Sequence, residues 1–74
     1  MNIQIVMDHS GDRRHTFDPS SIDSVRRAQR RFDDLTAKGF RAVALGKFDR
    51  PSALQDRFDP DVQETLFIPQ LQGG

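Results

Sequence analysis

The sequence predicts an α+β fold in which one long helix packs across a mixed sheet of four to five strands. Apolar and polar residues alternate over residues 2–7, which is the pattern of a half-buried strand. Apolar residues then recur every three to four positions over residues 22–35, which is the pattern of an amphipathic helix. Short apolar segments bounded by glycine, proline and aspartate follow the helix and supply further strands.

Length and composition narrow the class of protein. The 74 residues suffice for one domain, and we expect residues 1–69 to form it and residues 70–74 to be a flexible tail. A chain of this length buries roughly 60–65% of its unfolded surface, so a substrate cleft would consume much of the core. We therefore expect no enzyme, no catalytic residues and no cofactor.

The sequence also lacks the features of disulfide-bonded, metal-binding and membrane-spanning proteins. The absence of cysteine excludes a disulfide framework and the usual type of zinc site, and His9 and His15 lack the spacing of metal ligands. No apolar run approaches the ~18–20 residues of a membrane span, and the first residues do not form a signal peptide. We expect a cytoplasmic protein with no bound metal and no membrane partner.

The first 17 residues are predicted to form a hairpin. In the first strand, Ile3, Ile5 and Met7 point to one face, and Asn2 and Gln4 point to the other. A loop of four or five residues follows over 8–12, with Gly11 supplying a positive φ. The second strand covers residues 13–17 and should place Phe17 in the core and His15 at a bulge or half-exposed position.

Helix-start signals lie at Asp18, Pro19 and Ser20, and either Asp18 or Ser20 is expected to be the N-cap. Ser20 and Asp23 have the spacing of a capping box. The helix should continue to about Lys38, where Gly39 provides the stop. The stripe that should face the sheet consists of Ile22, Val25, Ala28, Phe32 and Leu35.

After the helix, residues 40–45 are predicted to form a third strand and residues 53–58 a short fourth strand. A single helical turn opened by Asp59 and Pro60 follows, and residues 65–69 form the last strand. The first and last strands should be adjacent and parallel in the centre of the sheet. Because the helix covers one face, the other face should be polar or available to partners.

The C-terminal segment has a distinct composition. Pro69 lacks an N–H group, so the chain should leave the sheet there. Gly73 and Gly74 carry no side chain, which suits a backbone that threads a narrow channel. The alternative is chance, because two terminal glycines arise in about one chain in 200 and small residues are common at chain ends.

These features resemble those of ubiquitin and the β-grasp ubiquitin-like proteins, including the small bacterial sulfur carriers. The shared features are the strand from Met1, the Gly11 hairpin turn, the central helix and the last strand running into a diglycine. The resemblance implies that an E1-type adenylating enzyme, which uses ATP, activates the carboxylate of Gly74 for transfer to a target protein or conversion to a thiocarboxylate. Gly73 would provide clearance, and the partner would read the tail of Pro69, Gln70, Leu71 and Gln72.

The segment Leu66-Phe67-Ile68-Pro69 also resembles the end of ubiquitin-like domains in phage tail-assembly proteins. This resemblance implies an alternative, in which the chain is a non-conjugated structural or assembly module of phage or mobile-element origin. Such a module would dock through the uncovered sheet face and Phe48. Phe48 could anchor a partner or fold back onto the core. In ubiquitin the positions of Gln70 and Gln72 are basic, so this tail departs from the ubiquitin pattern.

Arginines on the hairpin and helix raise the further possibility of a nucleic-acid interface. Asp23, Asp33 and Asp34 lie at ion-pair spacing from several of them, and the chain has no tyrosine or tryptophan to stack on bases. A solvated, partly salt-bridged helix face is therefore favoured over nucleic-acid binding. The arginines concerned are Arg13, Arg14, Arg26, Arg27, Arg30 and Arg31.

Overall fold

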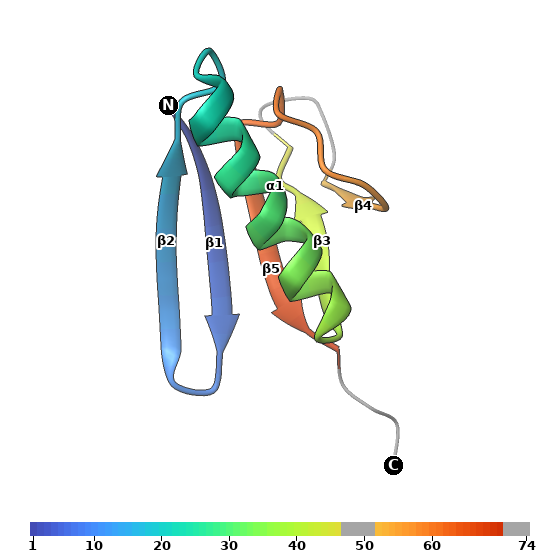
Figure 1. The fold of residues 1–74 in the computed structure, drawn as a ribbon. Coiled ribbons are helices and arrows are strands. Elements are labelled where there is room, and N and C mark those ends of the chain that lie inside the picture. The colour runs from blue at the N-terminus through green and yellow to red at the C-terminus, as the bar shows by residue number, and fades with distance from the viewer. Residues whose placement is uncertain (47–51, 71–74) are drawn as a thin grey trace.

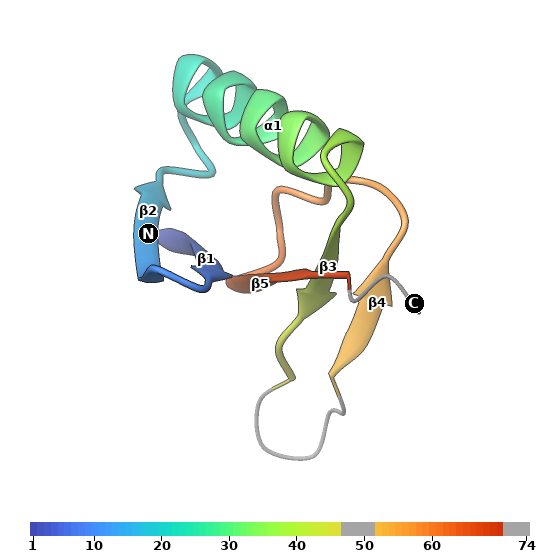
Figure 2. The ribbon, with the colours of Figure 1, turned by 90° about the horizontal axis from the view of Figure 1, so that it is seen from below.

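The structure is a computed structural model of the chain, and it describes residues 1–46 and 52–70. One helix lies across a single face of a five-stranded sheet whose strand order is β2-β1-β5-β3-β4 (Figures 1 and 2). The predicted ββαββ arrangement, which is that of a β-grasp fold, is confirmed. Within the described ranges no helix has the length and apolar content needed to cross a membrane. The elements are β1 (Asn2–Asp8), β2 (Gly11–Phe17), α1 (Ile22–Ala37), β3 (Phe40–Ala44), β4 (Ala53–Gln55) and β5 (Glu64–Pro69).

The centre of the sheet is formed by β5, which pairs parallel with β1 and antiparallel with β3. In the parallel pair Ile5 lies opposite Leu66, and Val6 lies opposite Phe67. The predicted parallel pairing of the first and last strands is therefore confirmed. This pairing holds two segments side by side that are about 60 residues apart in the sequence, and it joins the hairpin to the rest of the sheet.

The hairpin has a shorter loop than the sequence indicated. Only His9 and Ser10 separate the two strands, because Gly11 and Asp12 pair with Asp8 and Met7. The Asp8 carboxylate accepts a hydrogen bond from the Ser10 N–H (2.8 Å), which closes the turn. Gly11 has φ 124°, as predicted. The register runs without a bulge to Phe17, which is buried, and His15 is half-buried.

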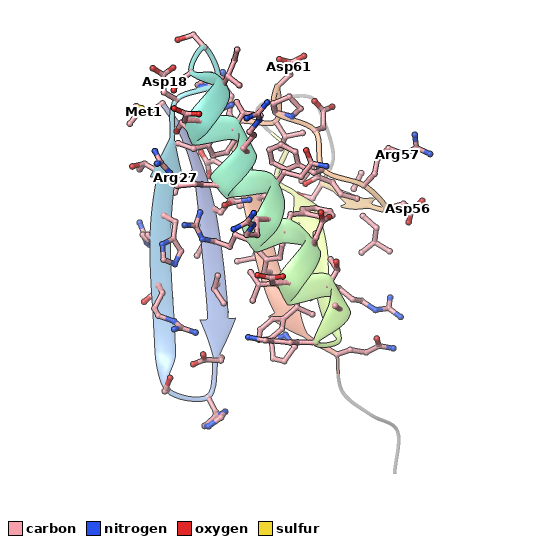
Figure 3. All side chains as sticks on the ribbon, viewed as in Figure 1. Met1, Asp18, Arg27, Asp56, Arg57 and Asp61 are labelled. Atoms are coloured by element: carbon pink, nitrogen blue, oxygen red, sulfur yellow. The ribbon has the colours of Figure 1, made fainter. Side chains whose placement is uncertain are left out.

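The N-cap of α1 is Ser21, so the expectation of Asp18 or Ser20 was wrong. The Ser21 hydroxyl accepts a hydrogen bond from the Ser24 N–H (3.4 Å). The Asp18 carboxylate instead accepts from the Ser20 N–H (2.9 Å) and closes the turn before the helix (Figure 3). At the other end Lys38 is the C-cap and Gly39 follows with φ 100°, as predicted.

The core lies between α1 and the β1 face that carries Asn2, Gln4 and Val6. The alternation along β1 was predicted correctly. The row that faces α1 is Asn2, Gln4 and Val6, and Ile3 and Ile5 lie on the opposite face. Asn2 is buried because its amide donates to the Pro60 carbonyl (2.7 Å). Partners so distant in the sequence leave no local signal.

Aromatic side chains fill the rest of the core. The Phe32 ring packs edge-on against Phe67 and Phe58, with centroid distances of 5.7 and 5.9 Å. Of the predicted helix stripe, Ala28, Phe32 and Leu35 are buried. Ile22, in the first helical turn, is 71% exposed, so its predicted core position was wrong.

The segment after the helix differs from prediction in two details. The strand β4 has three residues and ends at Gln55 rather than at residue 58. The predicted helical turn near residue 60 is an isolated hydrogen-bonded turn, in which the Val62 N–H donates to the Asp59 carbonyl (3.2 Å). The Asp59 carboxylate accepts from the Asp61 N–H (2.9 Å), so Asp59 caps a turn as predicted but no helix follows.

A matched pair of helix variants tests this assignment of the core. We expect Leu35→Ala to lower the free energy of unfolding by about 2–5 kcal/mol, because it leaves a cavity at a position that is 9% exposed. Ile22→Ala should change it by about 0.5 kcal/mol or less. Urea unfolding followed by circular dichroism measures both, and equal losses would contradict the core described here.

Candidate functional site

The end of β5 positions the candidate C-terminal site. Pro69 is exposed and is the last residue of β5, opposite Phe40 of β3. Gln70 follows, and its N–H donates to the Gly39 carbonyl (3.3 Å). The Gly39 carbonyl therefore holds the chain one residue beyond Pro69. The point from which the C-terminal segment departs is fixed beside the end of α1.

The remaining tail positions of the candidate site are Leu71, Gln72, Gly73 and Gly74. They lie outside the described residues, as does Phe48. The roles expected for them stay predictions. The described part of the site is Pro69 and Gln70, together with the β3 and α1 residues next to them.

A second candidate surface is the sheet face opposite α1, which we call the open face. One row of side chains crosses all five strands on this face, because residues paired directly across strands project to the same side. The row alternates along β1 with the buried Gln4 and Val6, so it points away from the helix. Its members are Arg14, Ile5, Leu66, Val43 and Leu54.

The open face has an apolar centre. Of the two alternatives expected for this face, polar or available to partners, the polar one was therefore wrong. Ile68 lies beside Leu66 on the same side of β5, opposite Arg41 of β3. Leu54 is 61% exposed and Met7 is 44% exposed. Ile5, Leu66, Val43 and Ile68, which lie between them, are half-buried. A contiguous apolar patch with charged neighbours is typical of protein-binding surfaces.

The carboxylates of Asp8 and Asp18 close turns. Hydrogen bonds from the Ser10 side chain and backbone hold the pKa of Asp8 below its ordinary value, and Ser20 does the same for Asp18. Over the described ranges no three histidine, cysteine or acidic side chains gather where they could hold a metal ion. In the turn before β5, the Asp59 carboxylate accepts a hydrogen bond from the backbone N–H of Asp61.

The arginines are arranged differently from the sequence-based expectation. The two ion pairs found among the described residues are both in the hairpin, Arg13–Asp8 at 3.3 Å and Arg14–Asp12 at 3.2 Å. Among the described residues, no arginine of α1 has a carboxylate within ion-pairing distance. The predicted salt bridges along α1 were therefore wrong. Arg27 lies on the side of α1 next to the hairpin (Figure 3).

Comparisons of the chain with protein-family models, with curated proteins and with solved structures found no match. The β-grasp assignment therefore rests on the strand order and the packing of α1.

Proposed function

We propose that the chain is a small ubiquitin-like modifier or carrier whose Gly74 carboxylate is activated by an E1-type adenylating enzyme. The observation that carries the proposal is the sheet topology. A ββαββ chain whose last strand is central and parallel to the first strand delivers its C-terminal segment from one fixed point, at Pro69 and Gln70.

The chemistry requires little of this chain beyond its carboxylate. The carboxylate attacks the α-phosphate of ATP bound by the partner and releases pyrophosphate, which forms an acyl adenylate. A thiolate of the partner, or a sulfide donor, then displaces AMP. The glycines allow close approach of the backbone to the nucleotide, and Pro69 limits the conformations from which the tail starts.

The test is to incubate the protein with ATP and candidate adenylating enzymes and to follow Gly74 by mass spectrometry. We expect an adenylate, thioester or thiocarboxylate on the wild-type chain. Gly73→Val should lower its rate of formation by about 10²-fold, because a misplaced reacting group has a cost of that order. Gly46→Val is the matched control, since Gly46 lies in an exposed segment after β3.

The proposal fails if the wild-type chain forms none of these products with any adenylating enzyme from its own cell. It also fails if Gly73→Val and Gly46→Val react at the same rate. Circular dichroism of each variant shows whether a loss reflects unfolding.

The open face favours a second candidate function, a non-conjugated docking or assembly module of phage or mobile-element type. The row through Ile5, Leu66 and Val43 offers an apolar centre, and Arg41 beside it favours a partner that is apolar with a carboxylate at its edge. In such a docking module, Gly73 and Gly74 would have no role.

Two charge-introducing variants distinguish this candidate. Leu54→Arg should reduce capture of the native partner by at least about tenfold, because it places a charge in an apolar contact. Ile22→Arg, at a similarly exposed position on the helix, should not. Quantitative mass spectrometry of proteins captured from the host cell measures both. Loss of capture on removing Gly73 and Gly74 would instead support the carrier function.

A further inference from the structure

Gln4 occupies a core position that an apolar residue would ordinarily fill. Its side chain is 0% exposed, and both of its polar ends are used. The amide nitrogen donates to the Ala28 carbonyl of α1 (3.0 Å), and the amide oxygen accepts from a guanidinium N–H of Arg31 (2.8 Å). Burying an amide is costly unless it is hydrogen-bonded. This core position therefore fixes the guanidinium of Arg31.

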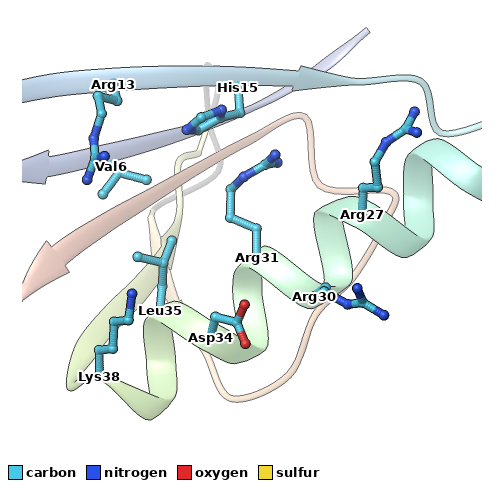
Figure 4. Close-up of a pocket in the computed structure, with 9 residues that line it drawn as sticks. All are labelled: Val6, Arg13, His15, Arg27, Arg30, Arg31, Asp34, Leu35 and Lys38. Carbon is cyan, nitrogen blue, oxygen red and sulfur yellow. The ribbon is translucent and has the colours of Figure 1, made fainter.

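Arg31 projects into a groove of about 390 Å³ between β2 and α1, which we call the hairpin–helix groove (Figure 4). Val6 and Leu35 contribute its apolar lining, and Arg31 extends toward His15 on β2. The register explains the placement, because His15 pairs with Gln4, so both project to the helix side of the sheet. The basic groups that line the groove are Arg13, His15, Arg27, Arg30, Arg31 and Lys38.

Positive charge in the hairpin–helix groove is poorly balanced. Asp34 is the carboxylate found in the lining, and Arg13 is paired outside the groove with Asp8. Across residues 1–46 and 52–70, no carboxylate lies within ion-pairing distance of Arg27, Arg30 or Arg31. Surface arginines that serve solubility need no fixed geometry, whereas Arg31 is half-buried and held by a buried amide.

Burial and neighbouring positive charge lower the pKa values of two groups in the groove. Burial, followed by the charge of Arg27, lowers the pKa of Arg31. Burial, followed by the charges of Arg31 and Arg13, lowers the pKa of His15. A carboxylate partner would shift both pKa values upward. The groove thus favours an incoming anion.

We propose that the hairpin–helix groove binds a phosphate-bearing ligand, with Arg31 as the fixed anchor and Arg13 and Arg27 as flanking donors. Guanidinium groups on opposite walls can donate to several oxygens of one phosphate or of neighbouring phosphates. A single carboxylate has only two oxygens and would leave some of these donors unused. The volume suits a di- or triphosphate group or a short stretch of phosphodiester backbone. This site is separate from the tail and does not depend on the proposed function.

The test uses the whole chain and two probes, inorganic triphosphate and a short single-stranded oligonucleotide. NMR titration of backbone amides gives the dissociation constants. Arg31→Gln should weaken binding of the preferred probe by at least about tenfold, because a charged hydrogen-bond donor is lost. Arg14→Gln is the control, since it removes one positive charge from the open face, on the other side of the sheet from the groove.

Gln4→Leu tests the anchor itself. It keeps every charge in the groove and replaces the buried amide with an apolar side chain of similar size, so the fold should persist while phosphate binding weakens several-fold. Should Gln4→Leu or Arg31→Gln fail to fold, Arg27→Gln, at an exposed position, gives the same comparison. Tighter binding of the oligonucleotide would identify a phosphodiester backbone, and tighter binding of triphosphate a free phosphate compound.

The pKa of His15 provides an independent readout. The charges of Arg31 on α1 and Arg13 on β2 act on it, and the other charged groups in the groove lining are Arg27, Arg30, Asp34 and Lys38. A bound phosphate should raise the pKa of His15, so affinity should increase as the pH falls through that pKa. Three outcomes overturn the proposal: no binding of either probe, an acidic peptide binding as tightly as triphosphate, or equal losses in Arg31→Gln and Arg14→Gln.

Discussion

The parallel pairing of β1 with β5 determines which side chains enter the core and which remain outside. Its register places Val6 beside Phe67, and Ala42 of β3 lies next to Phe67 in the same row. All three are buried against α1. A slip of β1 by one residue would turn that strand over and move Val6 to the opposite face of the sheet, because successive residues in a strand face opposite sides. The same register therefore fixes the core, the open face and the side chains of β1 that face the hairpin–helix groove.

The polar residues of β1 determine the character of the open face and of the face covered by the helix. On β1 the polar Asn2 and Gln4 face the helix, which leaves Ile3 and Ile5 on the open face. This inverts the usual arrangement, in which apolar residues face the covered side of a sheet. It is stable because the buried amides are hydrogen-bonded, and the described residues contain no buried side-chain nitrogen or oxygen without a partner. Hydrogen bonding thus permits an apolar surface where a polar one would be expected.

Local chemistry explains what the sequence could predict. Gly11 and Gly39 were placed correctly because positive φ is a local requirement, and the helix period identified Ala28, Phe32 and Leu35 as core residues. The orientation of β1 could not be predicted from alternation alone, because it depends on hydrogen bonds that span 58 and 24 residues. The hairpin–helix groove was missed for a similar reason: the arginines of α1 were interpreted against their helical neighbours, whereas Arg31 is positioned by a strand. The proposed diglycine site lies beyond the described residues.

The hairpin–helix groove and the open face lie on opposite sides of the sheet, yet both depend on β1. Gln4 anchors Arg31 on one side, while its neighbours Ile3 and Ile5 contribute to the other. Because β1 is paired along its length with β2 and with β5 at its centre, it cannot shift toward one surface without disturbing hydrogen bonds in both pairs. A phosphate-bearing ligand and a protein partner could therefore occupy their surfaces together without competing for the same side chains. Energetic coupling between the two surfaces would require β1 to adopt a second arrangement that breaks these hydrogen bonds, which favours independent binding.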